Sequence, residues 1–239
     1  MKDTPPPVGA AFDYSNLSER PPGRVLELLR HRFSGVDRVE SRIAVYASQW
    51  HEHNLGALAG TAPLWVALGD SITQGVGASS FARGWVMRAH QALDADHVPH
   101  RVLNLSVSGA RTADVVAHQI PAMIELGVSP ALVTVLIGSN DMLRHDHRAS
   151  LSDHYGQLLH ALPHGALVAM PVRTLGPLLT VKRQVEQAAA QGRVVVVPVR
   201  LGLRNHSEDH FHPNDLGHQS LADDFLGVLR TRLAVDAQA

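Results

Sequence analysis

The sequence contains three short polar motifs that together carry the side chains needed for acyl transfer to a serine. They are GDSITQG at residues 69–75, GSND at residues 138–141 and DHFHP at residues 209–213. A serine hydroxyl is a poor nucleophile until a neighbouring base accepts its proton, and that base must itself be held in one tautomer. The motifs supply Ser71 as the candidate nucleophile, His212 as the candidate base and Asp209 as the carboxylate that orients the base.

The third motif places the candidate base and its carboxylate on one predicted loop. Asp209 and His212 are three residues apart, so we expect the carboxylate to reach the imidazole Nδ1 and to leave Nε2 facing Ser71. Pro213 suits the first position of the closing helix, which predicts that His212 lies at the entry to that helix. Two other carboxylates lie nearby in the sequence, at Glu208 and Asp215.

The oxyanion of a tetrahedral intermediate needs fixed hydrogen-bond donors. We expect three: the backbone N–H of Ser71, the backbone N–H of Gly109 and the side-chain amide of Asn140. A glycine at position 109 lets the backbone approach a reacting carbonyl without a Cβ in the way. Asp141 is expected to hold the Asn140 loop by bonding nearby backbone.

The segments between the motifs alternate between strand and helix patterns. Short apolar runs rich in valine and leucine predict strands at residues 64–68, 102–107, 131–137, 166–171 and 194–198. Helical patterns occupy residues 84–97, 112–126, 151–162, 177–191 and 213–233, with Pro121 expected to interrupt the second. Such alternation predicts a parallel sheet between two helical layers, with the chemistry at the carboxyl edge of the sheet.

The motifs and their order resemble the SGNH (GDSL-type) hydrolases, from residue 64 to the C-terminus. The quoted blocks are GDSI, NLSVSG ending at Gly109, GSND and DHFHP, and isoleucine stands where the family more often has leucine after the serine. The resemblance implies an α/β fold: a three-layer α/β/α sandwich with a five-stranded parallel sheet in the flavodoxin-like order 2-1-3-4-5. It also implies ester hydrolysis through an acyl-serine, without a cofactor or metal, and assigns the roles given above to the matching residues.

The chain divides into an extension and a main domain. We expect residues 1–60 to form an N-terminal arm and helical extension packed on the core, and residues 61–239 to form the SGNH hydrolase domain. The arm runs to about residue 23, and helical patterns follow at residues 24–32 and 36–58. The second pattern has one apolar stripe, made by Ile43, Tyr46, Ala47 and Trp50.

Composition excludes several classes of protein. A net charge of −1 gives no reason to expect nucleic acid as a partner, and the absence of cysteine excludes disulfides and thiolate chemistry. No apolar stretch suits stable membrane insertion, and the first twenty residues lack a secretory apolar region, so a cytoplasmic location is expected. The sixteen histidines include the pairs 51/53, 145/147 and 210/212, but no H-E-x-x-H is present and no metal site is predicted.

The expected function is a serine esterase or acylhydrolase acting on small-molecule esters with small or medium acyl chains. An acyltransferase with the same residues and a non-catalytic binding module on the same scaffold stay open as alternatives, as does the oligomeric state. Arg111 and Arg173 are expected on loops at the same sheet edge, where they could meet a substrate anion.

Overall fold

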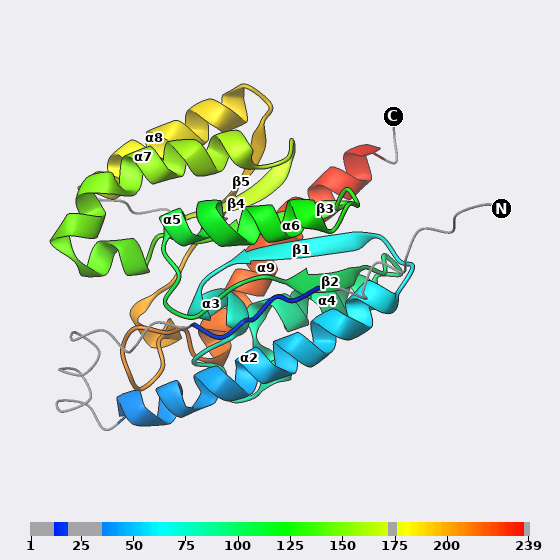
Figure 1. The fold of residues 1–239 in the computed structure, drawn as a ribbon, viewed down its shortest axis with the longest axis horizontal. Coiled ribbons are helices and arrows are strands. Elements are labelled where there is room, and N and C mark those ends of the chain that lie inside the picture. Colours follow the sequence, from blue (N-terminus) through cyan, green and yellow to red (C-terminus); the bar gives the residue numbers. More distant parts are fainter. Residues whose placement is uncertain (1–11, 19–34, 172–175, 237–239) are drawn as a thin grey trace.

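The structure is a computed structural model that describes residues 12–18, 35–171 and 176–236. A five-stranded parallel sheet lies at its centre, in the order β2-β1-β3-β4-β5 (Figure 1). The strands are β1 (Leu64–Gly69), β2 (Arg101–Asn104), β3 (Leu132–Leu136), β4 (Ala166–Pro171) and β5 (Val194–Val199). The predicted α/β fold and its strand order are confirmed.

Both faces of the sheet are buried under helices. The interior strand β1, which pairs with β2 and β3, is apolar throughout because its side chains enter both cores. Leu64, Val66 and Leu68 point into one core, whereas Trp65 and Ala67 point into the other. Helices of the first core are α6 (Ile120–Glu125), α7 (His145–Ala161) and α8 (Pro177–Ala190); the short helix α5 (Thr112–Asp114) precedes α6 in the chain. The second core is covered by α4 (Trp85–Ala95) and α9 (Asp215–Asp236).

Three helices differ from their predicted form. The helix predicted over residues 112–126 is divided by a π-helical turn, η2 (Val115–Gln119), and Pro121 falls in the first turn of α6, where its missing N–H costs nothing. Helix α7 starts at His145 rather than at residue 151. Helix α9 starts at Asp215 rather than at Pro213, because the side chain of Asn214 accepts the N–H groups of Leu216 and Gly217 and caps it.

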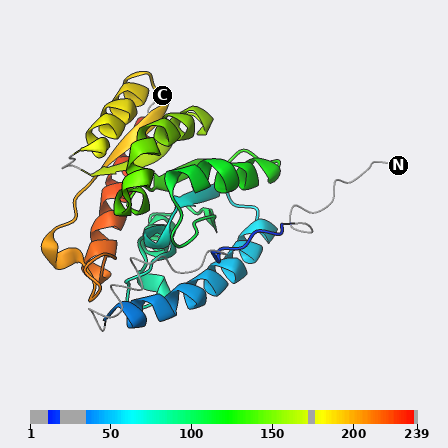
Figure 2. The same cartoon turned by 60° about the vertical axis from the view of Figure 1, so that its left-hand side comes forward.

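The long helix α2 (Gly35–Ala59) packs along β2 at one edge of the sheet, as Figures 1 and 2 show, beside residues 12–18. Its stripe residues Tyr46, Ala47 and Trp50 are buried, as the sequence predicts. The predicted helix at residues 24–32 and most of the predicted arm lie outside the described residues. None of the helices in the described part of the chain is long and apolar enough to cross a bilayer.

Candidate active site

The turn that carries Ser71 is fixed from both ends. β1 ends at Gly69, whose backbone N–H and C=O are both held by the side-chain amide of Gln119, at 2.9 and 2.8 Å. Ser71 then begins a four-residue helix, α3 (Ser71–Gln74), and Asp70 caps it by accepting the N–H of Ile72 at 3.0 Å. The candidate nucleophile is thus placed at the carboxyl end of β1 by a residue of the π-helical turn, which sequence patterning does not mark.

The predicted base and its carboxylate meet the serine in the expected order. His212 Nε2 lies 2.8 Å from Ser71 Oγ, and His212 Nδ1 lies 2.5 Å from Asp209 Oδ2. The other carboxylate oxygen of Asp209 accepts the Ser207 hydroxyl and the N–H groups of Phe211 and His212. Burial alone would raise the pKa of Asp209, but these hydrogen bonds and the nearby imidazole hold it well below its usual range.

The loop around His212 is closed by backbone pairing and not by the following helix. His206 and Pro213 form an antiparallel bridge, and the N–H of Ser207 donates to the carbonyl of His212 at 2.8 Å. Pro213 is therefore not the first residue of α9, and the prediction that His212 lies at the entry to that helix is wrong. The loop is pinned instead by its own turn and by Asp209.

Hydrogen bonds join the three turns that carry the predicted oxyanion donors. Asn140 Nδ2 donates to Ala110 O at 2.9 Å and to Asp70 Oδ2 at 3.2 Å, so it bridges the residue after Gly109 and the residue before Ser71. Gly109 has a φ of 77°, a left-handed conformation that favours glycine. Among the described residues, no hydrogen-bond acceptor faces its backbone N–H.

Two buried titratable side chains beside the site have shifted pKa values that the sequence does not indicate. The carboxylate of Asp70 is fully buried, and burial raises its pKa to about 6 despite hydrogen bonds from Ser139 and the N–H of Ile72. His218 accepts the N–H of Trp85 and donates to the carbonyl of Val76, and burial lowers its pKa to about 4.

The remaining candidate residues have other partners. Asp141 accepts the backbone N–H and hydroxyl of Thr112, which fastens the start of α5 to the Asn140 turn. Arg111 lies 2.7 Å from a ring nitrogen of His147 and 3.5 Å from a carboxylate oxygen of Asp114, so its charge is already engaged. Arg173 lies outside the described residues. Glu208 pairs with Arg38, and Asp215 with Arg83.

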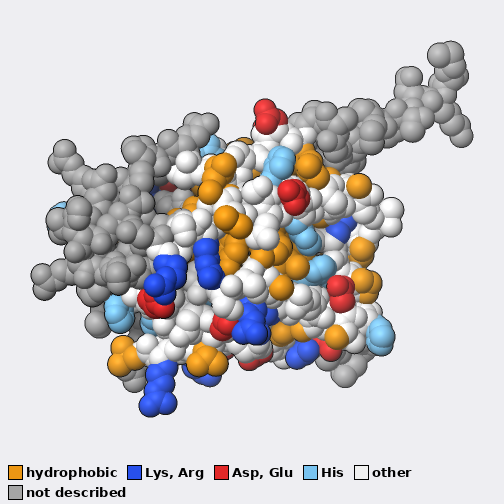
Figure 3. Space-filling model, turned by 90° about the horizontal axis from the view of Figure 1, so that it is seen from below, with side chains coloured by type: hydrophobic (Ala, Val, Ile, Leu, Met, Phe, Trp, Pro, Cys, Tyr) orange, Lys and Arg blue, Asp and Glu red, His pale blue; other side chains and the backbone are white. Residues whose placement is uncertain are grey.

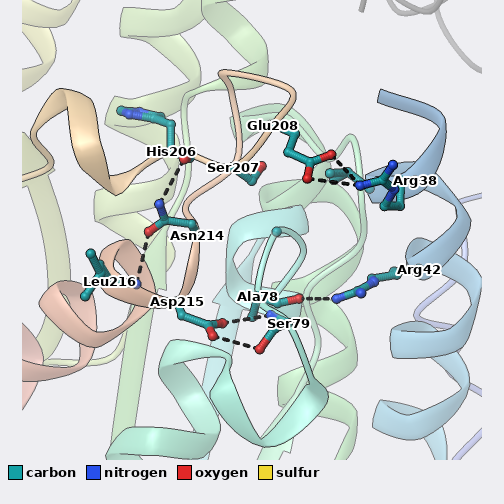
Figure 4. Close-up of a pocket in the computed structure, with 12 residues that line it drawn as sticks. Arg38, Arg42, Ala78, Ser79, His206, Ser207, Glu208, Asn214, Asp215 and Leu216 are labelled. Carbon is teal, nitrogen blue, oxygen red and sulfur yellow. Dashed lines mark hydrogen bonds and ion pairs between the residues drawn. The ribbon is translucent and has the colours of Figure 1, made fainter. Parts of the chain in front are cut away.

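A cavity of about 550 Å³ lies behind the His212 loop, between that loop and α2 (Figure 4). Its walls carry Arg38 and Arg42 from α2, opposite Glu208 and Asp215. Neither Ser71 nor His212 lines it, so this cavity is separate from the Ser71–His212 pair.

Histidines gather on the face that α2 helps to form, among apolar side chains (Figure 3). The ring of His53 lies between those of Trp50 and His90, with centroids 5.3 and 6.0 Å away, and burial lowers its pKa. Within the described ranges, no three histidine or carboxylate side chains are grouped so that they could hold a metal ion.

The sheet order, the serine at the end of β1 and the histidine loop before α9 can be compared with known proteins. A family model described as a GDSL-like lipase/acylhydrolase matches residues 67–220. The chain belongs to this family. Membership confirms the predicted resemblance and makes the chain a serine esterase or acylhydrolase, as the sequence motifs predict.

One curated relative is similar in sequence, and two solved structures are similar in fold. Esterase TesA of Pseudomonas aeruginosa is 30% identical over 140 residues, which cover 56% of this chain and 68% of that esterase. A crystal structure of TesA covers 70% of this chain and 98% of its own, with a TM-score of 0.58 and 24% identity. Axe2, an acetyl xylan esterase from Geobacillus stearothermophilus, shares the fold with a TM-score of 0.55 and 24% identity over 70% of this chain and 94% of its own.

Proposed function

We propose that this ester hydrolase works through Ser71 as the nucleophile, with His212 as general base and Asp209 as the residue that orients the imidazole. The observation that carries this proposal is the continuous relay from Ser71 Oγ through both ring nitrogens of His212 to Asp209. In this relay the base faces the hydroxyl and the carboxylate fixes the tautomer, which is the arrangement that activates a serine.

The reaction has two steps that use the same groups. Ser71 Oγ attacks the ester carbonyl while its proton passes to His212 Nε2, and the imidazolium then gives that proton to the leaving alcohol. A water molecule attacks the acyl-serine with His212 again as base, which releases the acid and restores the hydroxyl. The charge that develops on the carbonyl oxygen would be stabilised by the N–H groups of Ser71 and Gly109 and by Asn140.

The role of Asn140 requires one hydrogen bond to be exchanged. Its side-chain amide donates to the carbonyl of Ala110 and to the carboxylate of Asp70. The bond to Asp70, at 3.2 Å, is the longer of the two, so we expect the oxyanion to replace it while the bond to Ala110 keeps the side chain in place. Hydrogen bonds in a free active site are commonly longer than those in the reacting complex.

We also propose small or medium acyl chains as substrates. The similar proteins include an acetyl xylan esterase, whose name specifies a two-carbon acyl group, and the esterase TesA. The connections between β1 and α3 and between β3 and η3 (Asn140–Leu143) are short, which leaves little chain at these positions for a lid.

The test is hydrolysis of p-nitrophenyl esters from acetate to octanoate by the wild-type protein and by Ser71→Ala. We expect the wild type to favour the shorter esters and Ser71→Ala to lose activity by a factor of about 10⁶, as for other catalytic serines. Labelling of the wild type by a fluorophosphonate, and its loss in Ser71→Ala, identifies the nucleophile independently of the ester. Full activity in Ser71→Ala would refute the proposal.

A further inference from the structure

The β2 edge of the sheet is closed by side chains from outside the region that matches the family. Helix α2 and residues 12–18 both precede residue 67, where the family match begins. They lie beside β2 on the side that no other strand occupies (Figure 1). An unpaired edge exposes backbone N–H and C=O groups that need partners when they are buried.

Two asparagines of this extension supply those partners. The amide of Asn54 pairs with the last residue of β2 as a neighbouring strand would: its Oδ1 accepts the N–H of Asn104 at 2.8 Å and its Nδ2 donates to the carbonyl at 2.8 Å. Asn16 Nδ2 donates to the carbonyls of Asn104 and Ser106, at 2.9 Å each. Asn16, Asn54 and Asn104 are each no more than 2% exposed.

The same network continues to the turn of the proposed nucleophile. The side chain of Asn104 donates to the carbonyl of Thr73 at 3.0 Å. Gln74 donates to the carbonyls of Asn16 and Ser106, at 2.7 and 3.0 Å. Thr73 and Gln74 belong to α3, the short helix that starts at Ser71. A shift of Asn16 or Asn54 would therefore be transmitted to the helix that carries the nucleophile.

The network also reaches the turn of the proposed oxyanion donor. Ser108, the residue before Gly109, donates its hydroxyl to Gln74 Oε1 at 2.6 Å. α2 adds a separate bond to the nucleophile turn, because Trp50 Nε1 donates to the carbonyl of Gln74 at 2.9 Å. Buried polar networks in which every member is satisfied are rigid and allow one arrangement.

We propose that Asn54 and Asn16 are positioning residues, which set the separation between the Ser71 turn and the Gly109 turn from outside the family domain. The inference rests on the proposed function, since it assigns these asparagines a purpose only if both turns act on the ester. Neither asparagine touches the reacting atoms; each acts through Asn104, Gln74 and the backbone of β2.

The test compares Asn54→Ala with Leu58→Ala. Leu58 lies one turn further along the same helix and is 6% exposed, but it packs in the apolar core and has no side-chain polar group. Both variants lose buried contacts of α2 and should unfold at lower urea concentrations. We expect kcat for p-nitrophenyl acetate to fall by a factor of about 10 to 100 in Asn54→Ala with KM little changed, because small displacements of reacting groups have effects of that size.

In Leu58→Ala we expect kcat of the folded protein to stay within a factor of about two of wild type, because its losses fall on stability alone. The rate of fluorophosphonate labelling should separate the two variants in the same way. A second pair, Asn16→Ala and Leu17→Ala, repeats the comparison at the other asparagine. Leu17 is the adjacent residue and is exposed, so it serves as the control. This pair replaces the first if Asn54→Ala does not fold.

Equal kcat values in each asparagine variant and its leucine control would overturn the inference and leave the proposed function intact. Ser71→Ala is measured in the same series. If Ser71→Ala keeps its activity, the proposed function fails, whatever the asparagine variants show.

Discussion

Asp209 is held more firmly than its neighbours in the sequence. Its two carboxylate oxygens accept hydrogen bonds from His212, Ser207 and two backbone N–H groups, and its side chain is 7% exposed. Glu208, the next residue back, instead reaches an exposed ion pair with Arg38. Of these two carboxylates, Asp209 contacts the His212 imidazole and Glu208 contacts Arg38, which supports the orienting role proposed for Asp209.

The first prediction follows from that contrast. Asp209→Asn should lower kcat by a factor of about 10⁴, because an amide favours the wrong tautomer of the histidine. Glu208→Ala removes the neighbouring carboxylate of the same loop, which makes only an exposed ion pair with Arg38, so its kcat should be that of wild type. Steady-state kinetics on p-nitrophenyl acetate measures both variants. A similar fall in kcat in both variants would contradict the prediction, because it would show that the negative charge of the loop matters and the contact between Asp209 and His212 does not.

At the residue scale, the sequence indicates the groups that we propose to react but not the residues that support them. Ser71, Asp209 and His212 stand in short motifs whose residue types report their chemistry. Gln119, the last residue of the π-helical turn, holds Gly69 from 50 residues further along the chain. Nothing in the local pattern around Gln119 indicates that contact, because it depends on how the helix packs against β1.

At the scale of elements, the loop of Gly77 and the loop of His212 touch at their backbones. Gly77 has a φ of 97°, and a Cβ there would lie 2.2 Å from the carbonyl oxygen of Pro213 and 2.8 Å from His212 Cβ. The segment that follows the Ser71 turn and the His212 loop can approach this closely only because residue 77 has no side chain.

The second prediction concerns Gly77→Ala, which should push the histidine loop away from Ser71. We expect kcat to fall by a factor of about 10 to 100. Gly127→Ala is the matched control, since Gly127 has a φ of 66° but no atom near its Cβ position, so its cost should be the conformational strain of about 1–2 kcal/mol alone. Urea unfolding and kinetics of both variants measure the difference. Unchanged kcat in Gly77→Ala would contradict the prediction.

The elements themselves could largely be predicted, because buried parallel strands are continuous apolar runs and surface helices have a regular stripe. The start of α9 could not. Proline is common as the first residue of a helix. Here, however, the bridge to His206 holds Pro213 in the loop, and the side chain of Asn214 caps the helix. An isolated bridge between two loop segments leaves no periodic pattern of apolar residues in the sequence.

At the scale of the whole molecule, two buried groups give the folding stability opposite dependences on pH. Asp70 has a pKa of about 6 in the folded protein against an ordinary 3.8, so the folded state binds more protons between these values. The free energy of unfolding contributed by Asp70 therefore falls as the pH rises through this window. His218, at about 4 against 6.5, has the opposite sign: the unfolded state binds more protons, and its contribution rises with pH.

The third prediction is that the two contributions largely cancel between about pH 4 and pH 6, at about 3 kcal/mol each from shifts of two or more pKa units. Relative to wild type, the unfolding free energy of Asp70→Asn should rise with pH, and that of His218→Gln should fall. Urea unfolding at half-unit intervals from pH 4 to pH 7 measures both slopes. Two variants whose profiles run parallel to wild type would show that neither group titrates differently on folding.

The asparagines that cover the β2 edge also limit how far the protein can be truncated from its N-terminus. A chain trimmed to the family match would keep the residues proposed to react but would leave the backbone of β2 facing water. Such an edge is a template on which a second molecule can add a strand, so the shortened protein would be prone to associate edge to edge. The region that matches the family model is therefore shorter than the protein that should be expressed. Truncated variants, libraries and fusions should begin upstream of Asn16.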